Sequence, residues 1–165
     1  MSVLFRVLMC LAIAANVLCA AAIRHKTPGS DFPIAMATEI PASSAVVHFS
    51  GAVPTVINKS APKGSREAYG DTEAQTISAL QSIEKSLKSL GMETGDVVKM
   101  QVFLVGDPKN SDKMDFDGFM RGYVKFFGGK NQPNLPSRSV FQVVALANPA
   151  WLVEIEVTAV RKSGK

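Results

Sequence analysis

Three charged residues, Arg138, Glu154 and Glu156, lie in segments near the end of the chain that are otherwise typical of buried strands. Because side chains alternate across a strand, both glutamates share one face of the last segment. An unpaired charge in apolar surroundings is costly. Two interpretations are open. In the first, the charges are structural and form an Arg–Glu ion pair or a solvated face. In the second, the arginine binds a carboxylate beside a glutamate that acts as an acid or base. The opposite, apolar face consists of Val153, Ile155, Val157 and Ala159.

Two helices are expected upstream of these strands. Apolar residues at steps of three and four predict a first helix with Asp71 as its N-cap and Gly91 as its stop. An aromatic stripe predicts a second helix, capped by Ser111 or Asp112 and ended by Gly128. We assign these aromatic side chains to the core rather than to ligand stacking. The two stripes are Ile77, Leu80, Ile83, Leu87 and Leu90, and then Phe116, Phe119, Tyr123 and Phe126.

Strands surround these helices along the chain, and their order predicts the fold class. We expect an α+β domain in which two helices pack on one face of a mixed or mainly antiparallel sheet. The last two strands carry apolar residues on both faces, so we expect another subunit to cover the second face. The expected strands are residues 34–38, 45–49, 97–105, 137–144 and 152–160.

The first 22 residues have the pattern of a cleavable secretory signal peptide. Arg6 is followed by an uncharged apolar stretch and then by small residues at Ala20, Ala21 and Ala22. We therefore expect a periplasmic or secreted protein without stable membrane association after cleavage; an uncleaved anchor is the alternative. A flexible leader at 23–33, the domain at 34–161 and a basic tail at 162–165 follow.

Removing that segment limits the possible chemistry. Both cysteines, Cys10 and Cys19, lie inside it, and 143 of the 165 residues remain, which suits one domain. Without a thiol, and with only His25 and His48, neither a thiolate nucleophile nor a metal site is expected. Of the 18 basic residues, 17 remain against 14 acidic ones, several of them at the ends of the chain. We expect no nucleic-acid partner.

Four segments, taken in series, resemble the RidA/YjgF family of enamine/imine deaminases. They are HFSGAVP (48–54), DTEAQTISALQSI (71–83), DVVKMQVFL (96–104) and the pair PSRSVFQVVAL…LVEIEVTAV (136–160). The resemblance implies a chorismate-mutase-like single domain, assembled as a homotrimer with ligand clefts between subunits. It also implies hydrolysis of 2-imino or 2-enamino acids to 2-keto acids and ammonia, without a metal or an organic cofactor.

The resemblance assigns roles to individual residues. Arg138 matches the arginine that grips the substrate carboxylate, a task that suits its planar, permanently charged fork. Glu154 matches the glutamate that holds or activates the attacking water. Ser50 matches the serine of a Ser-Gly turn that lines the pocket, and Gly51 lets backbone approach the ligand closely.

Three positions depart from the family pattern. A pocket tyrosine is absent where the nearest register gives Phe32-Pro33-Ile34, and Met120 and Val140 stand where an asparagine and a cysteine are common. We count Ile34, Met120 and Val140 as substrate-binding positions and expect a more apolar pocket for a bulkier substrate. The alternative is a non-catalytic module that binds a small organic acid in the same cleft. A chorismate-mutase-type isomerase would require more basic groups than Arg138.

Overall fold

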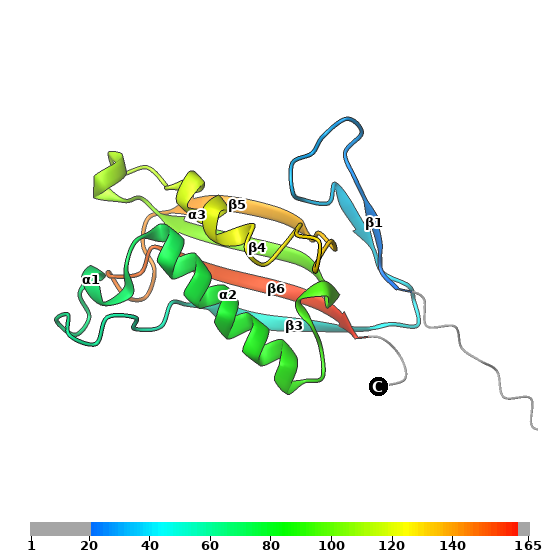
Figure 1. Cartoon of the computed structure of the whole chain (residues 1–165), viewed down its shortest axis with the longest axis horizontal. Coiled ribbons are helices and arrows are strands. Elements are labelled where there is room, and N and C mark those ends of the chain that lie inside the picture. The colour runs from blue at the N-terminus through cyan, green and yellow to red at the C-terminus, as the bar shows by residue number, and fades with distance from the viewer. Residues whose placement is uncertain (1–20, 162–165) are drawn as a thin grey trace, which may run out of the picture.

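The computed structural model describes residues 21–161, and its main element is a four-stranded sheet (Figure 1). The order of the strands is β3-β6-β4-β5; β4 and β5 run parallel, and the other neighbours are antiparallel. The α+β class and the mixed sheet are therefore confirmed. Most of the expected signal peptide (1–20) and the expected basic tail (162–165) lie outside the described residues. The strands are β3 Ala45–Ala52, β4 Val97–Val105, β5 Ser137–Val143 and β6 Val153–Arg161.

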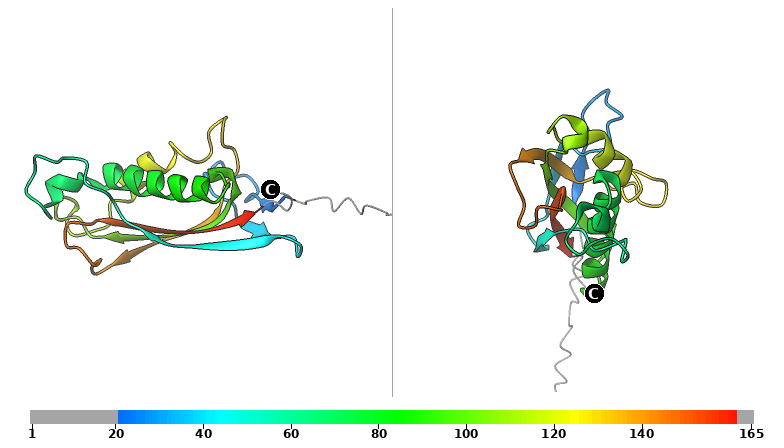
Figure 2. Two further views of the ribbon diagram at one scale, coloured as in Figure 1. Left: turned by 90° about the horizontal axis from the view of Figure 1, so that it is seen from below. Right: turned by 90° about the vertical axis from the view of Figure 1, so that its left-hand side faces the viewer.

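Two helices cover one face of this sheet, as Figure 2 shows from the side. Helix α2 spans Thr72–Ser89 and helix α3 spans Phe116–Tyr123; a short helix α1, Arg66–Tyr69, precedes them. The predicted N-cap is confirmed, because the Asp71 carboxylate accepts a hydrogen bond from the Ala74 amide at 2.9 Å.

The core lies between these helices and the sheet. Leu80, Ile83 and Leu87 of α2 are buried as expected, but Leu90 is 46% exposed because it follows the end of the helix. Burying a large aliphatic or aromatic side chain contributes about 1.5–3 kcal/mol, so this layer supplies much of the stability. The apolar face predicted for β6 is confirmed, since Val153, Ile155, Val157 and Ala159 are all buried.

Helix α3 begins and ends elsewhere than predicted. Its N-cap is Asp115, whose carboxylate accepts a hydrogen bond from the Gly118 amide at 2.8 Å. Ser111 and Asp112 adopt left-handed φ values of 56° and 58° in a separate turn, so neither caps the helix. The helix ends at Tyr123, and the turns that follow continue the aromatic layer with the buried Phe127.

The N-terminal segment contains a strand that the sequence did not predict. Ile23–His25 form strand β1, which pairs antiparallel with β2, Ala37–Glu39. The Arg24 guanidinium anchors this hairpin by donating to the backbone oxygens of Gly95 (2.8 Å) and Val97 (3.1 Å). The strand expected at 34–38 is thus shifted toward the C-terminus and belongs to a separate two-stranded sheet.

The last two strands are consecutive in the chain but are not neighbours in the sheet. Strand β4 lies between β5 and β6, and α3 provides the crossover between the parallel strands β4 and β5. On the face away from the helices, the rings of Phe103 and Phe141 stack at a centroid distance of 6.3 Å.

No helix within residues 21–161 is long and apolar enough to cross a membrane.

Candidate functional site

Arg138 projects from β5 toward α3, into a cluster of aromatic rings. Its guanidinium carbon lies 4.2 Å from the centroid of the Tyr123 ring and 4.9 Å from that of Phe119. A third ring, that of Phe32, lies 5.7 Å away and comes from the segment before β2. Tyr123 and Phe119 are fully buried, whereas Phe32 is 46% exposed. The guanidinium therefore packs against the two buried rings and has one partly exposed ring beside it.

The charge of Arg138 has no carboxylate partner within the described chain. Its Nη1 is buried without a hydrogen-bond partner, and its Nη2 lies 3.2 Å from the Met120 sulfur, a weak acceptor. Burial lowers the pKa of the Arg138 guanidinium from its usual value. By contrast, Arg66 pairs with Asp107 at 2.9 Å and Arg121 pairs with Glu73 at 2.8 Å. The charge of Arg138 is thus not neutralised by any carboxylate of residues 21–161.

The segment that carries Phe32 is held against the end of β5. The Tyr123 hydroxyl donates to the Pro33 carbonyl at 2.9 Å, and the Ala35 amide donates to the Pro136 carbonyl at 3.0 Å. Ile34, a predicted substrate-binding residue, lies between these two anchors and is partly buried. Tyr123 therefore contacts both the arginine and the backbone of the segment beside it.

Met120 and Val140 lie on the same side of the sheet as Arg138. Met120 touches the guanidinium from α3, and Val140 follows Arg138 by two positions on β5, which places both side chains on one face. Both are partly buried and pack against the core. We call Arg138, Met120, Val140 and Ile34 the arginine half-site.

Glu154 occupies the opposite face of the sheet. Arg138 pairs with Met100 of β4, whereas Glu154 pairs with Phe103, three positions further along the same strand. Paired residues share a face, and an odd separation along a strand reverses it, so the two charged side chains point away from each other. Within one chain, the interpretation as a structural Arg–Glu ion pair is therefore wrong, because Glu156 shares the face of Glu154.

Ser50 and Gly51 accompany Glu154. They lie on β3, where the register with β6 shifts between Phe49 and Ala52. A Cβ atom at Gly51 would collide with Oε1 of Glu154, so glycine is what allows the carboxylate to lie against β3. We call Ser50, Gly51 and Glu154 the glutamate half-site.

The residues of each half-site lie close together within one chain, but the two half-sites do not meet. β3 and β5 are the two edge strands of the sheet, and the half-sites use opposite faces. Sequence reasoning missed Phe32, Phe119 and Tyr123 as neighbours of Arg138. The aromatic periodicity correctly placed Phe119 and Tyr123 in the core, but no local pattern links them to an arginine that follows later in the chain.

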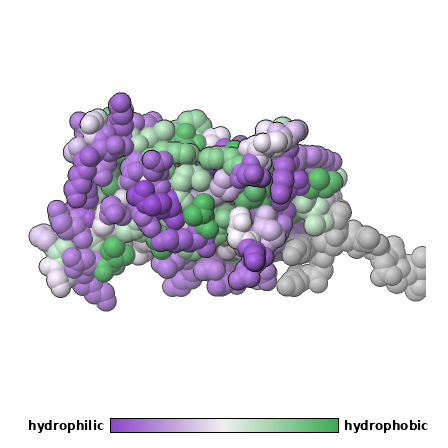
Figure 3. Space-filling model, turned by 45° about the horizontal axis from the view of Figure 1, so that its top comes forward, coloured by the Kyte–Doolittle hydropathy of each residue, from purple (hydrophilic) through white to green (hydrophobic). Residues whose placement is uncertain are grey.

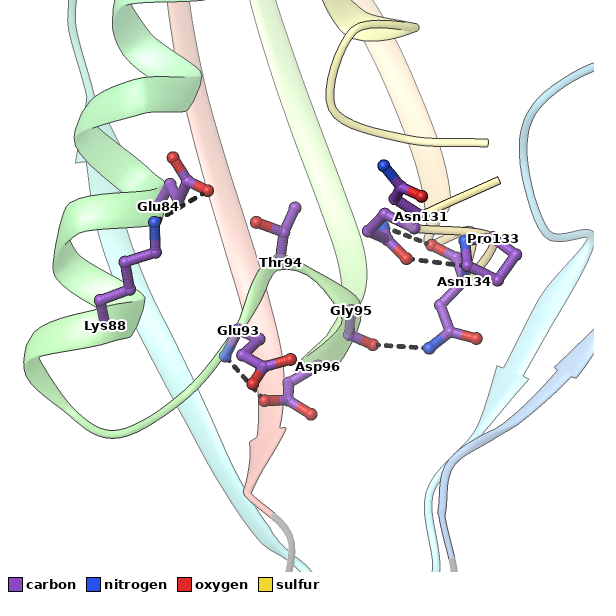
Figure 4. A pocket seen from close by; sticks show the side chains of 10 residues that line it. Glu84, Lys88, Glu93, Thr94, Gly95, Asp96, Asn131, Pro133 and Asn134 are labelled. Atoms are coloured by element: carbon purple, nitrogen blue, oxygen red, sulfur yellow. Dashed lines mark hydrogen bonds and ion pairs between the residues drawn. The ribbon is translucent and has the colours of Figure 1, made fainter. Parts of the chain in front are cut away.

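A polar cleft of about 330 Å³ lies away from both half-sites, between the end of α2 and the loop at 131–134 (Figure 4). Its polar groups largely bind one another. The Asp96 carboxylate accepts from the Glu93 amide at 2.8 Å, the Asn134 amide donates to the Gly95 carbonyl at 3.3 Å, and Lys88 pairs with Glu84. None of the predicted site residues lines this cleft. Across the described residues, no group of three or more His, Cys, Asp and Glu side chains could hold a metal ion.

The amino-acid sequence of this chain is similar to those of several known proteins. A family model described as endoribonuclease L-PSP matches residues 35–161. The putative reactive intermediate deaminase TdcF of Escherichia coli is 28% identical over 139 residues, which are 84% of this chain and 95% of that protein. The 2-iminobutanoate/2-iminopropanoate deaminase of Escherichia coli is 31% identical over 96 residues, covering 58% and 69% of the two chains.

Solved structures agree with the sequence matches. The crystal structure of Escherichia coli TdcF with bound serine has a TM-score of 0.56, with 26% identity over 87% of this chain and 99% of that one. YyfB of Yersinia pestis, a member of the Rid protein family, has a TM-score of 0.63, with 23% identity over 86% and 100% of the two chains. The described chain therefore has the chorismate-mutase-like fold of these proteins.

Proposed function

Because this chain belongs to the RidA/YjgF family, we propose that it hydrolyses 2-imino or 2-enamino acids to 2-keto acids and ammonia. One observation carries the proposal. Arg138 is a partly buried arginine whose charge no carboxylate of the described residues neutralises. A substrate carboxylate would supply that charge, and because Nη1 is buried, a bidentate contact requires the neighbouring side chains to move.

The reaction requires water at the imine carbon and one proton relay. In the proposed mechanism, the Glu154 carboxylate accepts a proton from water while the water oxygen bonds to the imine carbon and the C=N bond becomes single. For a protonated imine this gives a neutral aminoalcohol. Glu154 then returns the proton to nitrogen and the C–N bond breaks to release ammonia. The hydroxyl proton passes to that ammonia as the C–O bond becomes the keto group, so that the products are the keto acid and ammonium. A positioned acid/base group contributes roughly 10²–10⁴-fold to such a step.

Arg138 and Glu154 face opposite sides of one sheet, so a complete site needs two chains. We propose that the arginine half-site of one subunit meets the glutamate half-site of its neighbour in a homotrimer, the assembly that the resemblance implies. The exposed Phe141 and the stacked Phe103 on the uncovered face favour association, because this apolar surface would otherwise stay in water. The ligand class is a small organic acid.

A non-catalytic organic-acid binding module is the second candidate. It is favoured by the apolar side chains around Arg138, because Met120 and Val140 cannot relay a proton. Such a module would keep the Arg138 fork and would not depend on Glu154.

A coupled assay separates the two candidates. An amino-acid oxidase generates imino acids from small, aliphatic and aromatic amino acids, and keto-acid formation is measured above the spontaneous rate. We expect acceleration by the wild-type protein, expressed from its full-length sequence. Arg138→Ala should lower kcat/KM by roughly 10²–10⁴-fold through lost carboxylate binding. Glu154→Gln should lower kcat by a similar factor with little change in KM.

Arg138→Lys is a useful companion variant, because it keeps the charge and removes the fork. Melting temperatures of all variants show whether a loss of activity reflects folding. Unchanged turnover in both Arg138→Ala and Glu154→Gln would overturn the assignment. Tight binding of 2-keto acids without any imine hydrolysis would instead favour the binding module.

We also propose export, which rests on the sequence of residues 1–22 alone. Cleavage after Ala21 or Ala22 would leave the new terminus next to β1. Fractionation of expressing bacteria, with mass spectrometry of the purified protein, tests this proposal. A cytoplasmic protein that retains the first 22 residues would contradict it.

A further inference from the structure

The hairpin of β1 and β2 lies against the body of the domain next to the peptide bonds at which signal-peptide cleavage is expected. Ala22 is partly buried and, together with Ala21, lines a cavity of about 170 Å³. The expected cuts, at the 21–22 and 22–23 bonds, therefore lie at this cavity. Its other walls come from β1 and from segments far away in the sequence: Arg24, Gly95, Asp96, Asn134 and Val160.

Arg24 holds this segment in the cavity. Its Nη1 donates to the Ala22 carbonyl at 3.2 Å, and its Nη2 donates to the carbonyls of Gly95 at 2.8 Å and Val97 at 3.1 Å. Gly95 and Asp96 lie on the turn between α2 and β4 (Figure 4). Burial lowers the pKa of the Arg24 guanidinium, and the Asp96 carboxylate acts in the opposite direction. One side chain thus joins the backbone of the expected processing site to that turn.

The hairpin itself buries little apolar surface. In each strand only the central residue, Arg24 in β1 and Thr38 in β2, is partly buried, and its two neighbours are exposed. The hydroxyls of Thr38 and Ser137 lie 3.4 Å apart. At the end of the molecule that carries the hairpin, Figure 3 shows hydrophobic side chains interspersed with hydrophilic ones. Docking of the hairpin therefore depends on a few hydrogen bonds, of which Arg24 makes three.

A docked hairpin restricts access to the processing site. The two residues that follow Ala22 are paired with β2, Ile23 with Glu39 and Arg24 with Thr38. A peptidase needs the chain free on both sides of the bond that it cuts, so cleavage requires the hairpin to open first. The rate then follows the population of the open form, and opening costs least where few apolar contacts are lost.

Taking export as the premise, we propose that docking of the β1–β2 hairpin closes the processing site at residues 21–24, and that Arg24 keeps it closed. A signal peptidase adds water across the peptide bond, which leaves a carboxylate on the released peptide and an amino group on the domain. This step precedes docking, and a precursor that folds first retains its signal peptide. A cut after Ala21 preserves the hydrogen bond between Arg24 and Ala22, whereas a cut after Ala22 removes it.

The test is cleavage of the purified, folded full-length chain by a signal peptidase in detergent. A synthetic peptide of residues 1–30 is the open reference, and we expect the folded chain to be cut at least about 10-fold more slowly. Arg24→Ala should raise the cleavage rate of the folded chain by roughly 5–30-fold, because it favours the open hairpin. The same substitution in the peptide shows any direct effect on recognition by the peptidase.

Arg121→Ala is the matched control. Arg121 is an exposed arginine that pairs with Glu73 at 2.8 Å and makes no bond to the hairpin, so its removal should leave the cleavage rate unchanged. Melting temperatures show that each variant is folded under the assay conditions.

Failure of the export proposal and failure of this inference have different signatures. If the peptide is not cut, export fails, and elastase, which cuts after small residues, then measures the shielding of the same bonds. Slow elastase cleavage of the folded chain, accelerated in Arg24→Ala, supports the closed site. Equal cleavage of the folded chain and the peptide at the 21–22 and 22–23 bonds overturns it, as does an unchanged rate in folded Arg24→Ala.

Discussion

The arginine half-site and the glutamate half-site are built on one sheet by different means. Arg138 is positioned by core packing, since the rings of Phe119 and Tyr123 behind it are fully buried. The position of the Glu154 carboxylate depends on glycine at position 51, because any side chain there would occupy the same space. Substitutions around the arginine should therefore affect stability and binding together, whereas those around the glutamate should affect geometry with little loss of stability.

Subunit complementation gives the largest expected effect and tests whether the halves meet between chains. Arg138→Ala and Glu154→Gln should each lower activity by roughly 10²–10⁴-fold. After the two variants are unfolded and refolded together, random mixing in a cyclic trimer should restore about one quarter of the wild-type sites. The measurement is imine hydrolysis before and after mixing. Absence of recovery in verified mixed trimers would show that the two residues do not complete one site between subunits.

Gly51→Ala tests the glutamate half-site alone. The new Cβ must displace the Glu154 carboxylate, which is the mobile end of a side chain, so we expect roughly a 10²-fold fall in kcat with little change in melting temperature. Gly129→Ala is the control, because a Cβ at Gly129 meets nothing within 4 Å. Full activity of Gly51→Ala would show that the position of the Glu154 carboxylate does not matter.

Tyr123→Phe tests the arginine half-site through pH. Burial raises the pKa of Tyr123 to about 12 from 10.0. The native state then keeps its phenol proton where the unfolded chain has lost it, so this contribution is complete below pH 10 and is lost as pH rises toward 12. Stability should fall by up to about 2–3 kcal/mol over that range in the wild type, and less steeply in Tyr123→Phe.

Urea unfolding between pH 8 and 11.5 measures this slope. Tyr69→Phe serves as the control for the loss of a phenol. The absence of any difference between the wild type and Tyr123→Phe above pH 10 would show that Tyr123 titrates normally.

Arg24→Ala should have the smallest effect and extends the comparison to an arginine outside both half-sites. Its guanidinium donates to three backbone carbonyls, those of Ala22, Gly95 and Val97, and burial lowers its pKa. Because the side chain is only partly buried, we expect a loss of about 1–2 kcal/mol in unfolding free energy. Imine hydrolysis by the folded variant should stay unchanged. Reduced kcat without destabilisation would connect the β1–β2 hairpin to the site.

Local patterns predicted those elements whose signals lie within a few residues. Asp71 caps α2 as expected, because its carboxylate reaches an amide three residues ahead. The alternation in β6 correctly separated the buried face from the glutamates, because a strand has only two faces. The start of α3 was missed, because Asp112 and Asp115 are both plausible caps and only the tertiary turn, in which Asp112 adopts a left-handed φ of 58°, separates them.

Contacts between distant residues explain the remaining differences. Strand β1 depends on Arg24 reaching Gly95, 71 positions away, and no pattern near residue 24 reveals that carbonyl. The candidate site behaves in the same way. The resemblance predicts Arg138, Glu154, Ser50 and Gly51 as site positions, but it carries no information about the orientation of each side chain in this chain.

By itself, the sequence determined the α+β class, the caps and faces of its longest elements, and the family, because these depend on residue types at fixed spacings. Only the tertiary structure decided that β4 separates β5 from β6, and that Arg138 and Glu154 therefore point to opposite faces of the sheet. Only the tertiary structure brings the rings of Phe32, Phe119 and Tyr123 next to Arg138. The physical reason is that strand order and long-range packing arise from burial of the whole apolar surface at once, and no local segment specifies them.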